Sequence, residues 1–350
     1  MKVARLYRFD DIRIEDMPIP QIGPRDALIK TKACGICSGD VMPWYIEKKA
    51  PLVIGHEPVG EIVELGKELF TKGGITNFSV GDRVFVHHHA PCLNCKYCMR
   101  GDYVQCETWR NTKIIPGGIS EYILIPEINL RNDTLKLPEN VSYEDGTLVE
   151  PTACVVKSLK RANIKKGDTI LIIGLGVMGQ IHALLVREFG AEKIIGADII
   201  PFRLDKALEF GADYAIDVSK EDMSKKLKDL TDGMMADIVI TGPNSADVMK
   251  QGIEAASCGG TVVFFTPAKP GEILSLNPNY LYFRDINIVT SYSCGPDDTR
   301  ESLQFINKGI ITASKLVTHS FPIEETEKAY RITSEAKDSL KCTIAFGDGL

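Results

Sequence analysis

The sequence predicts an α/β protein with two parts, an irregular β domain followed by a domain built on a doubly wound parallel sheet. Up to about residue 151, short apolar or alternating runs are separated by Gly, Pro and Asp, a pattern typical of strands and turns. From residue 152 onward, apolar strands alternate with helical stretches of about ten residues, which indicates a parallel sheet covered by helices.

The elements expected in each part follow from these runs. Strands of the first part are expected at 27–33, 60–65, 82–89 and 120–126. Strands of the second part are expected at 169–173, 193–198, 214–218, 236–241, 261–266 and 286–291, and helices at 178–189 and 201–210.

The last segment does not extend the alternation cleanly. It predicts a helix after residue 294, a strand at 315–320, a helix at 323–333 and a strand at 341–346. We therefore expect this tail to return to the first domain. The predicted boundaries are 1–152 for the first domain, 153–294 for the second, and 295–350 for the return segment.

Composition and charge exclude several classes of partner. The 350 residues carry 41 Lys and Arg against 47 Asp and Glu, a net charge of −6, so the chain lacks the basic footprint of nucleic-acid or anionic-membrane binding. The N-terminus is charged and lacks the apolar core of a signal peptide, and no run approaches the roughly 18 apolar residues of a spanning helix. We expect a cytoplasmic protein without nucleic-acid or membrane partners.

Four cysteines spaced C-x2-C-x2-C-x7-C predict a structural zinc. They are Cys92, Cys95, Cys98 and Cys106, in a polar segment at about 90–108. Four thiolates can close a tetrahedral zinc, and such a segment has too few apolar groups to order itself. Two disulfides are the alternative, which a reducing compartment disfavours. The scattered cysteines are interpreted as core or incidental residues: Cys154, Cys258, Cys294 and Cys342.

A second set of ligand types predicts an open, catalytic zinc. Cys37 offers a thiolate, His56 an imidazole and Glu57 a carboxylate, and three protein ligands leave one position for substrate. Glu150, in Val-Glu-Pro at the presumed domain junction, is a further candidate. Because four protein ligands would leave no room for substrate, we expect Glu57 and Glu150 to exchange. The alternative for Glu150 is a helix-start or interface carboxylate.

A glycine motif predicts a dinucleotide site. Gly174, Gly176 and Gly179 follow an expected strand and open a helix, where they allow a tight turn, approach of a pyrophosphate and helix packing. The helix N-terminus at Val177 and Met178 then offers N–H groups to the phosphates.

The next expected strand ends at Asp198, where a carboxylate would accept hydrogen bonds from the adenosine ribose and repel a 2′-phosphate. The sequence therefore favours NAD over NADP. Arg203 either borders the adenosine pocket or is a solvated helix residue.

Together these motifs resemble the zinc-containing medium-chain alcohol dehydrogenases. The resemblance rests on GHEPVGEIVELG at 55–66, the Cys37 context, the cysteine quartet, Gly-Asp-Arg-Val at 81–84 and GLGVMG at 174–179, in family order along essentially the whole chain. Glu57 and the Glu150-Pro151 pair make it more similar to the sorbitol, threonine and polyol dehydrogenases than to the liver-type ethanol enzymes.

The resemblance implies a GroES-like catalytic domain built from both chain ends, with a Rossmann dinucleotide domain inserted. It implies catalytic-zinc positions at Cys37, His56, Glu57 and Glu150, and a structural-zinc lobe at the quartet. Asp40 matches the family carboxylate that holds the ligand histidine. The resemblance also suggests a homotetramer or dimer.

The chain departs from the family at the proton relay. Gly39 stands where the family usually has Ser or Thr, and Met42 where many members have His. Ser38 is expected to substitute if the turn is rearranged; water with Glu150 is the alternative. The loop at 67–77 is longer than usual and receives no role.

Three consecutive histidines and two aromatic residues remain. The three histidines end the strand expected at 82–89, so His87 and His89 are expected to share a face while His88 points away. Packing beside the cysteine lobe, or placing one ring at the substrate cleft, is favoured over a third metal site. Trp44 and Tyr45 either line the substrate pocket or pack in the core.

The sequence thus predicts an NAD-dependent zinc dehydrogenase that oxidises a secondary alcohol (a polyol, a sugar-derived alcohol or a hydroxy amino acid) to a ketone. Zinc lowers the pKa of the alcohol, and hydride passes to the nicotinamide. The alternatives are an NADPH-dependent alcohol or aldehyde reductase, and a non-catalytic protein that binds zinc and nucleotide.

Overall fold

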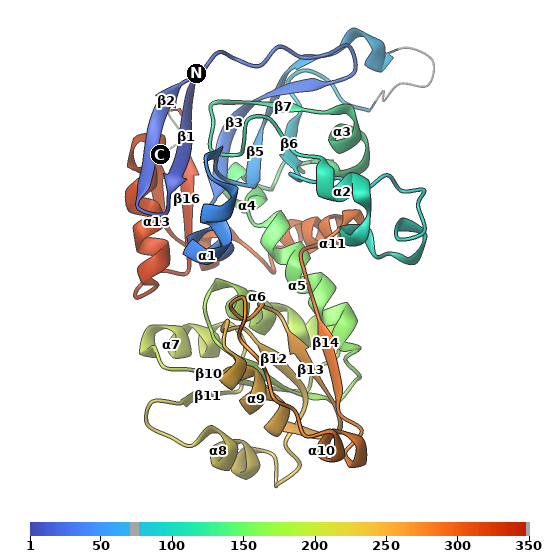
Figure 1. Ribbon diagram of the computed structural model, residues 1–350, viewed down its shortest axis with the longest axis vertical. Coiled ribbons are helices and arrows are strands. Elements are labelled where there is room, and N and C mark those ends of the chain that lie inside the picture. Colours follow the sequence, from blue (N-terminus) through green and yellow to red (C-terminus); the bar gives the residue numbers. More distant parts are fainter. Residues whose placement is uncertain (71–76, 348–350) are drawn as a thin grey trace. The chain divides into compact units, whose positions relative to one another are not determined.

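The computed structural model describes residues 1–70 and 77–347, and the chain divides into two compact units (Figure 1). Unit 1 comprises Met1–Ala153 and Cys294–Leu350, and unit 2 comprises Cys154–Ser293. Most of the long loop expected at 67–77 lies outside the described residues. Within the described ranges, no helix combines the length and apolarity needed to cross a membrane.

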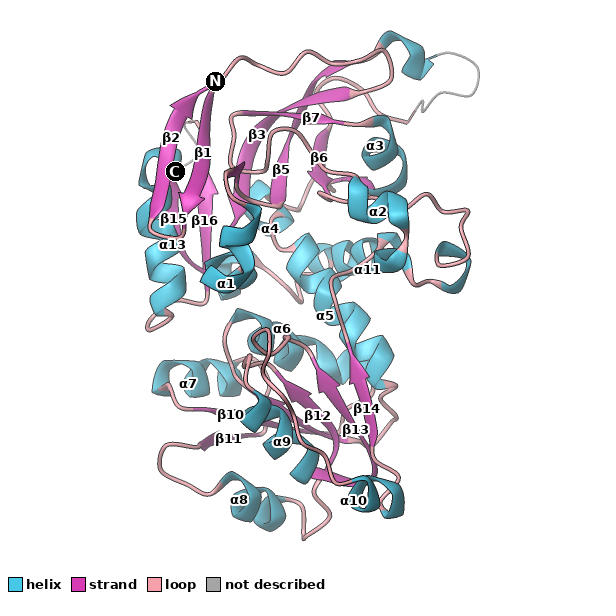
Figure 2. Cartoon of the chain, in the orientation of Figure 1, coloured by secondary structure: helices cyan, strands magenta, loops and turns pink. Residues whose placement is uncertain are grey.

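Unit 1 is built on a mixed sheet that draws strands from both ends of the chain (Figure 2). Its strand order is β15-β16-β3-β5-β6-β8, and β7 pairs with β3. The bounds are β3 (Ala27–Gly35), β5 (Glu57–Leu65), β6 (Arg83–Val86), β7 (Tyr122–Ile125), β8 (Thr134–Lys136), β15 (Val317–Pro322) and β16 (Lys341–Ala345). Because β16 pairs antiparallel with β3, the last segment of the chain is part of unit 1.

A smaller sheet and several short helices complete unit 1. The sheet has the order β2-β1-β4, formed by β1 (Lys2–Arg8), β2 (Asp11–Asp16) and β4 (Leu52–Val53). The helices are α1 (Pro43–Ile46), α2 (Glu107–Asn111), α3 (Glu127–Asp133), α4 (Tyr143–Gly146), α11 (Pro296–Asn307), α12 (Ala313–Leu316) and α13 (Thr326–Glu335). Apolar side chains of the small sheet, β16 and α13 form one core, which includes Leu6, Ile344 and Tyr330.

Unit 2 is a six-stranded parallel sheet with the order β11-β10-β9-β12-β13-β14. The strands are β9 (Thr169–Ile173), β10 (Lys193–Asp198), β11 (Tyr214–Asp217), β12 (Ala236–Thr241), β13 (Ala256–Phe264) and β14 (Asn287–Thr290). The helices are α6 (Val177–Leu185), α7 (Pro201–Glu209), α8 (Met223–Leu230), α9 (Ala246–Glu254) and α10 (Pro278–Phe283). Counted along the chain the order is 3-2-1-4-5-6, that of dinucleotide-binding sheets. Helix α5 (Val149–Ala162) spans the boundary between the two units.

One expectation about the first sheet is wrong. The strand expected at 82–89 ends at Val86, so the three histidines do not lie on it. Pairing stops because Val86 lies opposite Thr134, the first residue of β8. The chain before Thr134 is the helix α3, so one more backbone hydrogen bond follows, from the His87 N–H to the Asp133 carbonyl over 3.1 Å.

Candidate functional site

Four cysteines of one loop bring their sulfur atoms together in unit 1. The Sγ atoms of Cys92, Cys95, Cys98 and Cys106 all lie within 4.8 Å of one another, and all four are free thiols rather than the two disulfides of the alternative. The closest separations are 3.5 Å for Cys95–Cys98 and 3.6 Å for Cys92–Cys106. A tetrahedral zinc with Zn–S bonds of about 2.3 Å places its sulfurs about 3.8 Å apart, so the quartet fits a structural zinc.

The surroundings of the quartet favour thiolate at Cys106, whereas burial raises the pKa of Cys98 to about 12. Burial raises the pKa of Cys106, but backbone N–H donors from Cys92 and Trp109 outweigh it and lower the pKa to about 6. The Cys92 N–H donates to the Cys106 Sγ over 3.4 Å. Apart from the cysteines, only Val104, Trp109 and the partly buried Tyr103 form the apolar core of this loop among the described residues, which is consistent with a metal holding it together.

Pairing of β3 with β5 assembles the second set of ligands. The register places Gly35 opposite Glu57, so Cys37, two residues beyond Gly35, meets His56 and Glu57. Their ligand atoms lie within 4.8 Å of one another. A Cβ atom at position 35 would collide with the Glu57 carboxylate, so glycine lets that carboxylate lie over β3.

A short 3-10 helix, Ser38–Val41, orients two of these ligands. Cys37 caps it, and its Sγ accepts a hydrogen bond from the Gly39 N–H over 3.3 Å. Asp40, which is only 4% exposed, lies 3.0 Å from Nδ1 of His56, which leaves Nε2 as the nitrogen available to a metal. Burial lowers the pKa of His56, but the charges of Asp40 and Cys37 raise it well above its usual value. The site therefore favours positive charge, as a divalent ion would supply.

Lys341, which the sequence did not single out, forms a buried ion pair with Glu57. Their side chains are 2% and 0% exposed, and Lys341 Nζ also donates to the Ile36 carbonyl over 3.0 Å. Burial raises the pKa of Glu57; Lys341 opposes that shift, and Glu150 adds to it. Oε1 of Glu57 has no hydrogen-bond partner among the described residues. The carboxylate thus has one oxygen on Lys341 and one available to a metal.

The glycine motif of unit 2 forms the turn between β9 and α6. Gly174 has a φ of +89°, which favours glycine, and a Cβ atom at position 179 would collide with the Gly174 carbonyl. Asp198, at the end of β10, accepts hydrogen bonds from the N–H groups of Leu175, at 2.7 Å, and of Ile199 and Ile200. The turn, the helix N-terminus and a carboxylate therefore meet as a dinucleotide site requires.

Comparison with known proteins identifies the family. Residues 23–139 match the alcohol dehydrogenase GroES-like domain, and residues 177–308 match the zinc-binding dehydrogenase domain. The chain is 32% identical over 322 residues to a sorbitol dehydrogenase of Halalkalibacterium halodurans, covering 91% of each chain. It belongs to the zinc-containing medium-chain alcohol dehydrogenases, in the polyol branch.

Solved structures of other dehydrogenases share the fold. The 2R,3R-butanediol dehydrogenase of Bacillus subtilis has a TM-score of 0.86 at 26% identity, with 99% of each chain covered. A zinc-binding dehydrogenase from Sinorhizobium meliloti 1021, solved with NADP, has the same TM-score, identity and coverage. These relatives place the protein among zinc-dependent oxidoreductases of alcohols and polyols.

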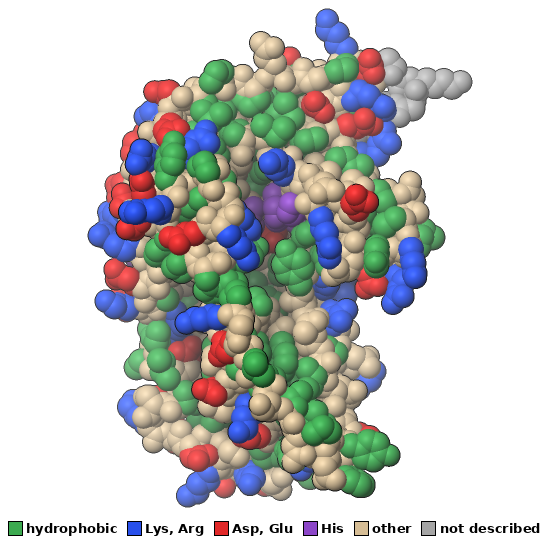
Figure 3. Space-filling view, viewed as in Figure 1, with side chains coloured by type: hydrophobic (Ala, Val, Ile, Leu, Met, Phe, Trp, Pro, Cys, Tyr) green, Lys and Arg blue, Asp and Glu red, His purple; other side chains and the backbone are tan. Residues whose placement is uncertain are grey.

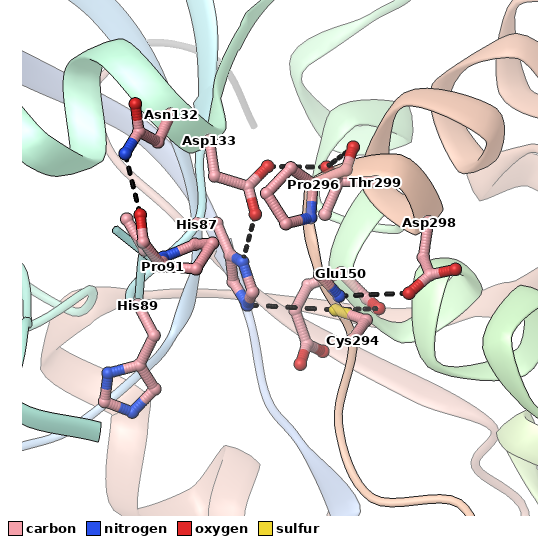
Figure 4. A network of polar contacts seen from close by, with 12 residues as sticks. His87, His89, Pro91, Asn132, Asp133, Glu150, Cys294, Pro296, Asp298 and Thr299 are labelled. Carbon is pink, nitrogen blue, oxygen red and sulfur yellow. Dashed lines mark hydrogen bonds and ion pairs between the residues drawn. The ribbon is translucent and has the colours of Figure 1, made fainter. Parts of the chain in front are cut away.

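Glu150 does not join Cys37, His56 and Glu57 in the structure of this dehydrogenase. Its carboxylate instead lies within 4.8 Å of the ligand atoms of His87 and Cys294 (Figure 4). It is 5% exposed and lies at the start of α5, close enough to Glu57 to raise the pKa of that carboxyl. Its binding to the catalytic zinc, and its exchange with Glu57, stay predictions.

The three consecutive histidines diverge. His87 is buried against Asp133, the ring of His88 lies 4.8 Å from that of His56, and His89 packs 4.4 Å from Trp109 beside the cysteine lobe. Figure 3 shows histidine side chains gathered on one face of unit 1. Burial, together with the charges of His89 and His56, lowers the pKa of His88 well below its usual value, so this neutral ring borders the second ligand set.

The residues of the expected proton relay lie in the short 3-10 helix Ser38–Val41 or directly after it. Ser38 is exposed, and a Cβ atom at Gly39 would lie 3.4 Å from the Cys37 Sγ. Trp44 and Tyr45 are half-buried, with their rings edge to face at 5.9 Å. Substitution of Ser38 for the family hydroxyl therefore stays a prediction, as does lining of the substrate pocket by the two aromatic residues.

Replacing Asp40 by asparagine is expected to weaken zinc binding at the second ligand set by about 10–100-fold, because the ring of His56 loses its charged partner. Competition with a chromogenic chelator measures this affinity. Asp40→Glu, which keeps the charge, is the control and should recover part of the loss. Equal zinc affinity in Asp40→Asn and the parent protein would contradict the orienting role.

Proposed function

We propose that the protein is an NAD-dependent zinc dehydrogenase that oxidises a secondary alcohol to a ketone, with two zinc ions per chain. The observation that carries the proposal is the set of Cys37, His56 and Glu57, whose ligand atoms lie within 4.8 Å of one another and whose imidazole is oriented by Asp40. Family membership supports the same reaction class.

The charges and hydrogen bonds around this ligand set suit it to binding and activating an alcohol. When bound, zinc supplies Lewis acidity that lowers the pKa of an alcohol, and NAD accepts its hydride. Cys37 and Glu57 supply negative charge, and the Gly39 N–H steadies the thiolate. Lys341 balances the Glu57 charge in a region from which water is excluded. The Glu150 carboxylate lies beside His87 and Cys294 instead. The set therefore has three protein ligands and keeps one coordination position for substrate.

Asp198 supports NAD as the cofactor. Its charge lies at the end of β10, where the adenosine ribose binds in such sheets, and would repel a 2′-phosphate. One observation favours NADP as the second candidate: the guanidinium of Arg203 lies 3.7 Å from the Asp198 carboxylate, and guanidinium groups bind phosphate well. The Sinorhizobium relative was solved with NADP.

Replacing Asp198 by asparagine is expected to shift cofactor preference toward NADP by about 10-fold or more, because like-charge repulsion of the 2′-phosphate disappears. The ratio of kcat/KM for NAD to that for NADP measures the shift. Asp217→Asn, at the end of the neighbouring strand β11, is the control. A parent protein that prefers NADP would refute the cofactor assignment directly.

We infer that the substrate is a polyol, a sugar-derived alcohol or a hydroxy amino acid, which the sorbitol and butanediol dehydrogenase relatives support. The test is a screen of NAD and NADP reduction, on zinc-quantified protein, against polyols, sugar alcohols, hydroxy amino acids and simple alcohols. NADH formation on a secondary alcohol is the expected result. Turnover with primary alcohols or aldehydes and NADP(H) alone would establish the reductase alternative.

We also propose that units 1 and 2 are the catalytic and dinucleotide domains.

We further propose that the protein is a cytoplasmic homo-oligomer, a tetramer or dimer, which the family resemblance supports. Light scattering on protein eluting from a size-exclusion column measures the molar mass of the assembly, and the mass of a monomer would refute the proposal.

A further inference from the structure

We propose that Gln180 is a positioning residue that fixes the adenosine end of the dinucleotide site and contributes to the choice between NAD and NADP. Gln180 directly follows Gly179, the third glycine of the motif, and lies near the start of α6. Its side chain is fully buried. The inference rests on the proposed function, because it assigns a role within the same nucleotide site.

The side-chain amide of Gln180 joins the glycine turn to the helix α7. Its Nε2 donates one hydrogen bond to the Leu175 carbonyl over 2.9 Å and another to the Arg203 carbonyl over 2.8 Å. A primary amide has two N–H donors, so both are used. One side chain therefore holds the backbone of the turn and the backbone of α7 at a fixed separation.

These two hydrogen bonds are part of a closed cycle that runs through Asp198. The Leu175 N–H donates to Oδ2 of Asp198 over 2.7 Å, and the guanidinium of Arg203 lies 3.7 Å from the same oxygen. Leu175 is thus held through its N–H by Asp198 and through its carbonyl by Gln180. Releasing one member of the cycle would loosen the contacts of the others.

The cycle lies where the adenosine half of a dinucleotide binds in sheets of this kind. There the carboxylate at the end of β10 accepts hydrogen bonds from the ribose, and the glycine turn receives the pyrophosphate. A Cβ atom at Gly176 would lie 3.9 Å from Nη1 of Arg203, so the guanidinium lies beside the turn. Because Gln180 is fully buried, it acts through Leu175 and Arg203 rather than by touching the nucleotide.

The position of α7 determines how the two charges of this site act. While the Arg203 guanidinium stays beside Asp198, it steadies the carboxylate that would accept from the ribose and repel a 2′-phosphate. A guanidinium released from that position could bind the phosphate instead, since its planar donors match phosphate oxygens. Loss of the Gln180 hydrogen bonds should therefore weaken NADH binding more than NADPH binding.

The competing explanation is that Gln180 only fills space under α6. Its Oε1 is buried without a hydrogen-bond partner among the described residues, and a buried acceptor without a donor costs free energy. An apolar side chain of the same length would fill the space without that cost. A space-filling role therefore predicts that such a substitution leaves the cofactor preference unchanged.

Dissociation constants for NADH and NADPH, measured by fluorescence titration of the full-length protein, test the proposal. Gln180→Met keeps the length of the side chain and removes the amide. We expect the ratio of the NADPH constant to the NADH constant to fall by about fivefold, the worth of one net hydrogen bond. Gln180→Asn, which keeps a shorter amide, should fold as well and show part of this shift.

Ile181→Val is the matched control for a general loosening of α6. Ile181 is buried next to Gln180 but lies outside the cycle, so its shortening should leave the ratio within about twofold of the parent. Thermal unfolding of each variant shows whether the comparison is made at similar stability.

The background Arg203→Met tests whether Gln180 acts through α7. If it does, adding Gln180→Met to Arg203→Met should leave the ratio unchanged. A ratio in Gln180→Met equal to that of the parent, or the same shift in both backgrounds, would overturn the proposal. Absence of turnover on every alcohol would instead refute the proposed function, and the binding constants would still decide the role of Gln180.

Discussion

Replacing Cys37 by alanine is expected to abolish hydride transfer while nucleotide binding persists. The substitution removes the one thiolate of the catalytic ligand set, and the Lewis acidity lost with the zinc is worth several kcal/mol of the barrier, or about a 10³-fold decrease in kcat/KM. Steady-state rates on the best alcohol of the screen measure the loss. Fluorescence titration with NADH measures cofactor binding, which depends on the glycine turn of unit 2.

Two comparisons make this result decisive. Cys342→Ala, which removes a buried thiol outside the ligand sets, should keep turnover and metal content near those of the parent. Cys37→Ala should lose one zinc equivalent together with its activity. Turnover within about tenfold of the parent in metal-quantified Cys37→Ala would refute the zinc mechanism, since that factor is only about 1.4 kcal/mol of barrier.

The parallel sheet of unit 2 could be predicted closely because its strands are continuous apolar runs. Four of the five strand residues of β9 are buried, so the expected strand at 169–173 agrees with the observed one. Parallel strands are covered on both faces, and their sequences therefore contrast with the helices between them. The N-terminal hairpin of unit 1 could not be predicted in the same way, because β1 and β2 bury only part of their residues and charged side chains occupy the exposed faces.

The metal ligands divide in a similar way. The cysteine quartet and the His56-Glu57 pair are local in sequence, and their spacing already indicates zinc. Cys294 is the opposite case, because one cysteine in an apolar context resembles a core residue whatever its neighbours in the fold. Its spatial neighbour His87 is distant in sequence, and only the packing of α11 and α3 beside β6 brings them together, through contacts such as Thr299 with Asp133.

Lys341 shows the same limit at the catalytic site. From its place in the sequence, a lysine at the start of the last strand is expected to be exposed to solvent. The pairing of β16 with β3 instead buries it beside Glu57. Nothing in the spacing of the motifs reports this pairing, because it joins the two ends of the chain. The charge balance of the site is therefore a property of the folded sheet rather than of a motif.

Replacing Lys341 by methionine is expected to destabilise unit 1 by about 3–5 kcal/mol, because it leaves the Glu57 carboxylate buried without its cation. Both side chains are almost fully buried, so solvent cannot compensate. Urea unfolding of the metal-free protein, followed by fluorescence, measures the change in free energy. Lys32→Met is the matched control: its pair with Glu61 lies at 3.8 Å and is about one-third exposed, so its removal should cost less than about 1 kcal/mol.

The double variant Glu57→Gln, Lys341→Met separates a lost attraction from an uncompensated charge. If Lys341→Met is destabilising because it leaves the Glu57 carboxylate buried without a cation, neutralising Glu57 should recover most of the lost free energy of unfolding. Removing both partners of a buried pair is often nearly neutral. The coupling energy between the two positions should then exceed about 2 kcal/mol. A double variant as unstable as Lys341→Met would instead assign the loss to packing of the lysine stem and to its bond with the Ile36 carbonyl. Zinc added to Lys341→Met should also restore stability, since a metal ion would replace the missing positive charge at Glu57.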